Sequence, residues 1–139
     1  MKLVEKYSGI LFDVLFEDSD KVCVFLSPSG TGKTFLFSVL TEYLKEKGVG
    51  SVLINSTLLG NLHNDIGTIK QICLDSDVKV VILDNADLYL TQDFLDALVS
   101  RGKTIIVSLK DESNLSFSNF GFYRVKYTGD SLNVRRKLG

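Results

Sequence analysis

Two glycines, a lysine and a threonine stand close together in the segment SPSGTGKT at positions 27–34. Gly30 and Gly32 let the backbone curl so that successive N–H groups point toward one anion. Lys33 adds a mobile positive charge, and the hydroxyl of Thr34 is a hard oxygen ligand of the kind that Mg²⁺ accepts. These residues predict a site for a phosphate group and a divalent cation.

Such a loop needs an element on each side to hold it in place. The apolar run VCVFL at 22–26 predicts a strand buried on both faces. After the loop, apolar residues recur at helical spacing over 36–44 and predict a helix that ends near Gly48. The positive end of that helix would also favour a bound phosphate.

This strand–loop–helix segment resembles the P-loop, or Walker A motif, of the P-loop NTPase superfamily, with Ser27 in place of the usual first glycine. The run VVILD at 80–84 resembles the Walker B motif, an apolar strand that ends in an acid. The resemblance implies that ATP is bound with Mg²⁺, and that Thr34 and Asp84 hold the metal. It implies nucleotide contacts from Ser27, Pro28, Ser29, Gly30, Thr31, Gly32, Lys33, Thr34 and Phe35.

Further apolar runs predict strands at 52–54, 78–83 and 104–107, and an alternating run predicts an edge strand at 122–127. Helices are expected over 59–73 and from a cap at Thr91 to about Ser100. Strands that alternate with helices favour parallel pairing. The expected fold is therefore α/β: one P-loop domain over 1–139, with a mostly parallel five-stranded sheet, in the order 5-1-4-3-2, flanked by helices.

Two end segments lie outside the five strands. Residues 1–20 are expected to form an extension with a short helix that packs on the domain or binds a partner. Residues 128–139 are expected to form a basic tail. Five basic residues and one acid lie between positions 124 and 139, which leaves two alternatives open: a solvated tail, or contact with nucleic acid or an acidic partner.

The residues expected to take part in catalysis are Lys33, Asp84, Asn85 and Ser108. In AAA+ and related ATPases a strand between the two Walker strands carries a polar sensor residue, and TIIVS at 104–108 resembles that strand. Asn85 stands where many of these ATPases have a glutamate, and an amide can orient water but cannot take its proton. Asp87 and Asn55 are further candidates, for acid–base catalysis and for contact with the terminal phosphate.

An arginine finger is not evident from the sequence. Arg101, Arg124, Arg135 and Arg136 are candidates, but none lies in a recognisable finger motif. Only about 32 residues remain outside the predicted core, so we expect a second copy or a protein partner to supply the arginine. The segment SLKD at 108–111 lacks the asparagine of the guanine-reading N-K-x-D motif, which favours adenine.

Two other functions remain open. The loop also fits a small-molecule or nucleotide kinase, although residues 110–119 contain no arginine that could serve in a lid. A non-enzymatic module that changes its surface when it binds nucleotide would also explain the missing glutamate.

Composition limits the remaining classes of protein. The chain has 139 residues, 45% hydrophobic and 24% charged, with a net charge of −1, which suits one globular domain and excludes a collagen-like or disulfide-rich protein. Cys23 and Cys73 lie in apolar runs and are expected to be buried thiols, and His63 is expected at the surface. The sequence shows no membrane span and no signal peptide, so a cytoplasmic location is expected.

Overall fold

The computed structural model describes residues 1–26, 33–63, 65–110 and 115–137. The strands it describes are β1 (Lys2–Tyr7), β2 (Ile10–Leu15), β3 (Val22–Leu26), β4 (Ser51–Ile54), β5 (Val80–Leu83), β6 (Thr104–Leu109), β7 (Phe120–Tyr127) and β8 (Ser131–Arg136). The helices are α1 (Lys33–Glu46), α2 (Ser56–Asn61), α3 (Ile66–Leu74), α4 (Gln92–Ser100) and a short 3₁₀ helix, η1 (Ala86–Leu88). Within these residues, no helix has the length and apolar character needed to cross a bilayer.

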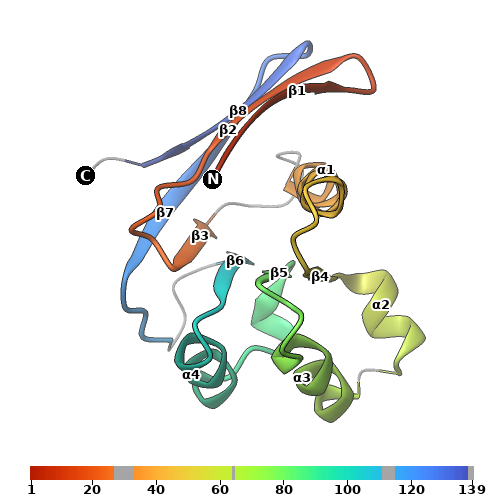
Figure 1. Ribbon diagram of the computed structural model, residues 1–139, viewed down its shortest axis with the longest axis vertical. Coiled ribbons are helices and arrows are strands. Elements are labelled where there is room, and N and C mark those ends of the chain that lie inside the picture. The colour runs from red at the N-terminus through yellow and green to blue at the C-terminus, as the bar shows by residue number, and fades with distance from the viewer. Residues whose placement is uncertain (27–32, 64, 111–114, 138–139) are drawn as a thin grey trace.

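All eight strands join one mixed sheet in the order β1-β2-β8-β7-β3-β6-β5-β4. The strands from β7 to β4 pair in parallel, as do β2 and β8, whereas β7–β8 and β1–β2 are antiparallel. The sheet curls into a half-barrel (Figure 1). The predicted fold, a mostly parallel five-stranded sheet flanked by helices, is therefore wrong. β7 is not an edge strand, because β8, β2 and β1 extend the sheet beyond it.

Helix α1 lies in the hollow of the curled sheet (Figure 1). Its apolar side chains share one buried cluster with residues of β2, β3, β5, β6 and β8. The helix contributes Leu36, Phe37 and Leu40, each fully buried. We call β1, β2 and β8, which lie beyond β7, the added strands. Because the cluster continues from the parallel strands to the added strands, both parts of the sheet cover the same helix.

Helices α3 and α4 cover the other face of the parallel strands, around a second buried cluster. Strand β3 shows how the sequence supplies both clusters: Cys23 and Phe25 point into the first, and Val22 and Val24 into the second. Successive side chains of a strand point to opposite faces, so a central strand that is covered on both faces needs a continuous apolar run. The run predicted at 22–26 therefore becomes the strand that leads to the SPSGTGKT segment.

The helix expected within residues 1–20 is not present; β1 and β2 form a hairpin instead. Ser8 and Gly9 both have positive φ, 52° and 78°, and Tyr7 pairs with Ile10. Two central residues with positive φ are typical of a type I′ hairpin turn, whose twist matches that of the strands. Gly9 is thus the turn between two strands rather than a break in a helix.

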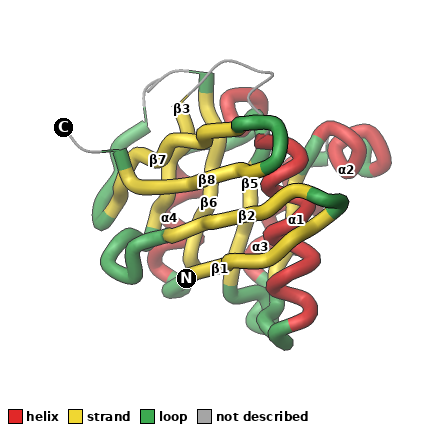
Figure 2. The backbone as a smooth tube through the Cα atoms, turned by 90° about the horizontal axis from the view of Figure 1, so that it is seen from above, coloured by secondary structure: helices red, strands yellow, loops and turns green. Residues whose placement is uncertain are grey.

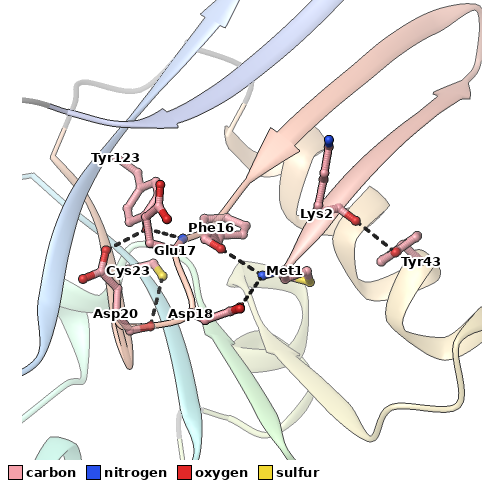
Figure 3. A network of polar contacts seen from close by, with 9 residues as sticks. All are labelled: Met1, Lys2, Phe16, Glu17, Asp18, Asp20, Cys23, Tyr43 and Tyr123. Carbon is pink, nitrogen blue, oxygen red and sulfur yellow. Dashed lines mark hydrogen bonds and ion pairs between the residues drawn. The ribbon is translucent and has the colours of Figure 1, made fainter.

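The added strands are fastened to the rest of the domain by polar contacts (Figure 3). The Tyr123 hydroxyl on β7 donates to Oδ2 of Asp20 at 2.7 Å and accepts from the backbone N–H of Glu17 at 2.8 Å. On the opposite side, the Tyr43 hydroxyl of α1 donates to the carbonyl oxygen of Lys2 at 3.1 Å. The segment after β2 is therefore anchored to β7, and the strand β1 is anchored to α1.

Two further expectations need correction. Residues 131–136, expected as part of a tail, form β8 between β7 and β2. The single helix expected over 59–73 is two helices, α2 and α3, and His63 between them has a φ of 53°. The predicted helix cap at Thr91 is confirmed, since its side chain accepts from the Phe94 N–H at the start of α4.

Candidate functional site

The carboxyl ends of β5 and β6 and the start of α1 bring together four residues that the sequence selects. Lys33 and Thr34 begin α1, Asp84 directly follows β5, and Ser108 lies near the end of β6. Strand β6 lies between β3 and β5 in the sheet, and all three are parallel. Their carboxyl ends therefore share one edge, the usual place for ligands in open α/β sheets.

The Asp84 carboxylate is the centre of this group. Its side chain is buried, with 5% of its surface exposed. Oδ2 accepts a hydrogen bond from the Thr34 hydroxyl at 3.1 Å, and Oδ1 accepts one from the Ser108 hydroxyl at 2.8 Å. Two hydroxyls from distant parts of the chain thus hold the two oxygens of one acid.

The backbone around Asp84 is held as firmly as its side chain. Ser108, which is fully buried, accepts from the backbone N–H of Asn85 at 2.8 Å. The hydroxyl of Tyr89 donates to the carbonyl oxygen of Asp84 at 2.9 Å. Asn85 adopts the left-handed conformation, with φ 51° and ψ 50°, which asparagine tolerates better than most residues. Its side chain is exposed, so the amide is open to water or a ligand.

Lys33 is buried beside the acid, with 7% of its surface exposed. Burial lowers the pKa of its ammonium group below the usual value, while the charges of Asp84 and Asp87 act in the opposite direction. A cation placed in a low-dielectric site interacts strongly with a charged ligand. Lys33 thus places a cation beside Asp84 at the start of α1.

The other candidates have different places. The Asn55 side chain caps α2 by accepting from the Leu58 N–H at 2.9 Å. Asp87 is exposed on η1 and accepts from the Lys110 N–H at 2.7 Å. Asp87 nevertheless lies close enough to act on the charge of Lys33, whereas the oxygen of Asn55 is already used by a helix cap.

The candidate arginines lie away from Asp84 in their described contacts. Arg101 donates to the carbonyl oxygen of Leu74 at 3.4 Å. Arg135 and Arg136 make ion pairs with Asp13 and Asp20. Arg124 lies on β7 opposite Arg135. The described residues thus place no hydrogen-bonded arginine at the Asp84 carboxylate.

Part of the predicted nucleotide site lies outside the described residues, namely Ser27, Pro28, Ser29, Gly30, Thr31 and Gly32. Phe35, predicted to contact nucleotide, is on α1 with 38% of its surface exposed, and its ring lies 5.4 Å from that of Phe12 on β2. The aromatic contact places this side chain toward the added strands.

The residues present suit Mg²⁺ in the way that phosphate-bound Mg²⁺ is usually held. The described residues contain no group of three or more His, Cys, Asp or Glu side chains that could hold a metal ion. Mg²⁺ at phosphates needs only one or two protein oxygens, with water and phosphate as the other ligands. The Thr34 hydroxyl and the Asp84 carboxylate supply two such oxygens 3.1 Å apart.

Sequence reasoning did not select Tyr89, yet it holds the Asp84 backbone. Its hydroxyl is buried and lies 3.4 Å from the carbonyl oxygen of Ile54, besides its contact with Asp84. Burial, followed by the charge of Asp84, raises the pKa of this phenol, so it stays a hydrogen-bond donor. A tyrosine five residues after an acid has no sequence signature, which is why the role emerges only from the fold.

Comparison with protein-family models, with curated proteins and with solved structures finds no match for this chain.

Proposed function

We propose that this chain binds ATP with Mg²⁺ at the start of α1 and hydrolyses it slowly by itself. The observation that carries the proposal is the Asp84 carboxylate, which joins the hydroxyls of Thr34 and Ser108. The acid of the Walker B-like run thereby lies next to the threonine of the Walker A-like segment, although 50 positions separate them in the sequence.

Each side chain has a defined part in this proposal. The segment at 27–32 and the first N–H groups of α1 would bind the phosphates, and Lys33 would neutralise the charge of the terminal ones. Thr34 and Asp84 would hold Mg²⁺, which screens the phosphate charge when it is bound. Ser108 keeps the carboxylate in position by donating to it.

The weak point for catalysis is proton transfer. Asn85 is exposed beside Asp84 and can orient a water molecule, but its amide cannot accept the proton. Asp87 is the nearby acid that could take it, although its carboxylate already accepts from the Lys110 N–H. We therefore propose that hydrolysis becomes efficient only when a second copy or another protein supplies an arginine, worth about 10³–10⁵ in rate.

A non-enzymatic role is the second candidate, because the position after Asp84 carries an amide and not a carboxylate. In that case bound ATP would stabilise one arrangement of the site without turnover. A cytoplasmic location and a preference for adenine over guanine remain predictions from the sequence.

Binding of a fluorescent ATP analogue, with Mg²⁺ or with EDTA, tests the proposal. Lys33→Ala should weaken binding about 10- to 100-fold, the value of one charge-assisted contact. Lys45→Ala removes the same charge from the exposed far end of α1 and should leave binding unchanged. Equal affinity in the Lys33→Ala variant and the wild type would refute the site.

Phosphate release by the same proteins separates the two candidate functions. Slow release that disappears in Lys33→Ala supports hydrolysis. Tight, Mg²⁺-dependent binding with release no faster than in Lys33→Ala supports the non-enzymatic module. Competition by GTP as effective as that by ATP would contradict the adenine preference.

A further inference from the structure

Cations gather on one face of β7 and β8, which lie side by side in Figure 2. In the antiparallel register Arg124 pairs with Arg135, and Lys126 pairs with Asn133. Side chains alternate between the two faces of a strand, so Lys137, two positions after Arg135, continues the same face. These five residues define the β7–β8 basic face. Tyr123 and Leu132 on the same strands point to the opposite face, into the buried cluster.

Few acids balance this charge. Asp13 pairs with Arg135 at 2.9 Å. Among the described residues, Arg124, Lys126 and Lys137 make no ion pair within 4.0 Å, and all three are exposed. Like charges directly opposite each other destabilise a pair of strands, so the Arg124–Arg135 pair lowers the stability of the free protein. The whole chain is slightly acidic, with a net charge of −1, so this concentration is local.

The basic face is hollowed. A depression of about 370 Å³ is lined by Arg124, Lys126, Asn133, Arg135, Arg136 and Lys137. This is close to the lower end of the volumes of small-ligand sites, roughly 300–1,000 Å³. All six lining side chains are polar and five are cationic, of which Arg135 is paired with Asp13 and Arg136 with Asp20.

The polar lining distinguishes between anionic partners. A membrane-binding surface uses apolar side chains that enter the lipid together with its cations. The exposed large apolar residues of this chain are Val4, Leu11, Phe35, Leu88 and Tyr127, and none of them lines the depression. A row of lysine and arginine side chains with an amide among them fits a phosphate backbone, which supplies repeated negative charge and hydrogen-bonding groups.

We propose that the β7–β8 basic face binds nucleic acid through its phosphate backbone. Arg124, Lys126 and Lys137 contact phosphates, and the Asn133 amide hydrogen-bonds to a sugar or a base. Binding of this kind depends on charge and depends little on sequence. It does not require the nucleotide site at Asp84.

Fluorescence anisotropy with labelled oligo-dT and oligo-U of about 16 nucleotides, the upper site size of small single-strand binding folds, tests the proposal. With three phosphate contacts the slope of log K against log salt is about −2, so affinity falls about 20-fold between about 50 and 200 mM salt. The double variant Arg124→Glu with Lys126→Glu should bind at least about 10-fold more weakly and lose about 1.4 of that slope. The matched control, Lys45→Glu with Lys47→Glu on exposed positions at the end of α1, makes the same change in net charge and should bind as the wild type does.

Several outcomes would overturn the proposal. The first is an equal loss of binding in the control pair, and the second is absence of binding at low salt. The others are tighter binding of vesicles with anionic lipid, or equal binding of polyglutamate. Far-ultraviolet circular dichroism of each variant shows whether the sheet is retained. Lys33→Ala should bind the oligonucleotide normally, so this test and the test of the ATP site can fail independently.

Discussion

Replacing Ser108 with alanine removes one hydroxyl from the centre of the candidate site and should lower the stability of the folded protein. The side chain is 1% exposed, so water cannot take the place of the hydroxyl. The hydroxyl donates to Oδ1 of Asp84 and accepts from the Asn85 N–H, both at 2.8 Å. Alanine leaves the buried carboxylate with one donor fewer and leaves the N–H without this acceptor.

The size of the effect follows from these two bonds. A hydrogen bond to a charged group contributes about 1.5–3 kcal/mol and a neutral one about 0.5–1.5 kcal/mol. The Asn85 N–H is half-buried and regains part of its bond from water, so the sum is about 2–3 kcal/mol. For 139 residues the unfolding entropy is about 0.3 kcal/mol per kelvin, so the melting temperature should fall by about 7–10 °C.

Thermal unfolding followed by circular dichroism measures this shift. Ser100→Ala is the matched control, because its exposed hydroxyl donates only to the carbonyl oxygen of Ala97 within α4. A change of less than about 2 °C is expected there. A double-mutant cycle of Ser108→Ala with Asp84→Ala should give a coupling of about 1–2 kcal/mol. A Ser108→Ala shift no larger than that of the control, or zero coupling, would refute the claim that Ser108 positions the acid.

Three further predictions follow from other buried groups. In Gly121→Ala the new methyl group would collide with the Asp20 carboxylate, so unfolding stability should fall by about 2–3 kcal/mol in urea titrations, and an unchanged midpoint would contradict the close approach. Lys33→Met removes the positive charge that faces the buried Asp84 carboxylate, so stability should fall by about 1–3 kcal/mol and the proposed ATP binding should be lost; an unchanged midpoint in the same titration would contradict this. Burial raises the pKa of Cys23 and of Cys73 to about 12, so the thiols of the unfolded chain lose their protons at a lower pH than those of the folded protein. The free energy of unfolding should therefore fall between about pH 9 and 10, by up to about 1.4 kcal/mol per thiol. Replacing both cysteines with alanine should flatten that pH dependence, and an unchanged slope would count against the prediction.

The central strands and the acid that follows β5 were predictable because their signals are local. The run at 22–26 is apolar on both faces, and β3 occupies these residues. Asp84 directly follows one apolar run and Ser108 ends another. Parallel pairing of the two strands was therefore enough to place both residues at the carboxyl ends of the strands. The roles of Tyr89 and of the Asn85 backbone were not predictable, because they depend on a tight 3₁₀ turn after β5 that directs one hydroxyl back to the Asp84 carbonyl.

The half-barrel was missed for a different physical reason. Leu3, Val14 and other apolar residues of 1–20 fit the spacing of a helix as well as the alternation of a strand. In the hairpin these two side chains join the buried cluster of α1, and the hairpin is held there by the pairing of β2 with β8. That pairing joins residues more than 100 positions apart, so no local window contains it. The short run at 131–136 was missed as well. Leu132 and Val134 are buried, but they alternate with polar residues and the run ends in two exposed arginines. Read alone, those basic residues suggest a solvated tail. Placed beside β7, Arg135 lies opposite Arg124, whereas Arg136 lies opposite Tyr123. The sheet that buries the apolar face of β8 therefore also brings Arg135 next to the cations of β7 on its outer face.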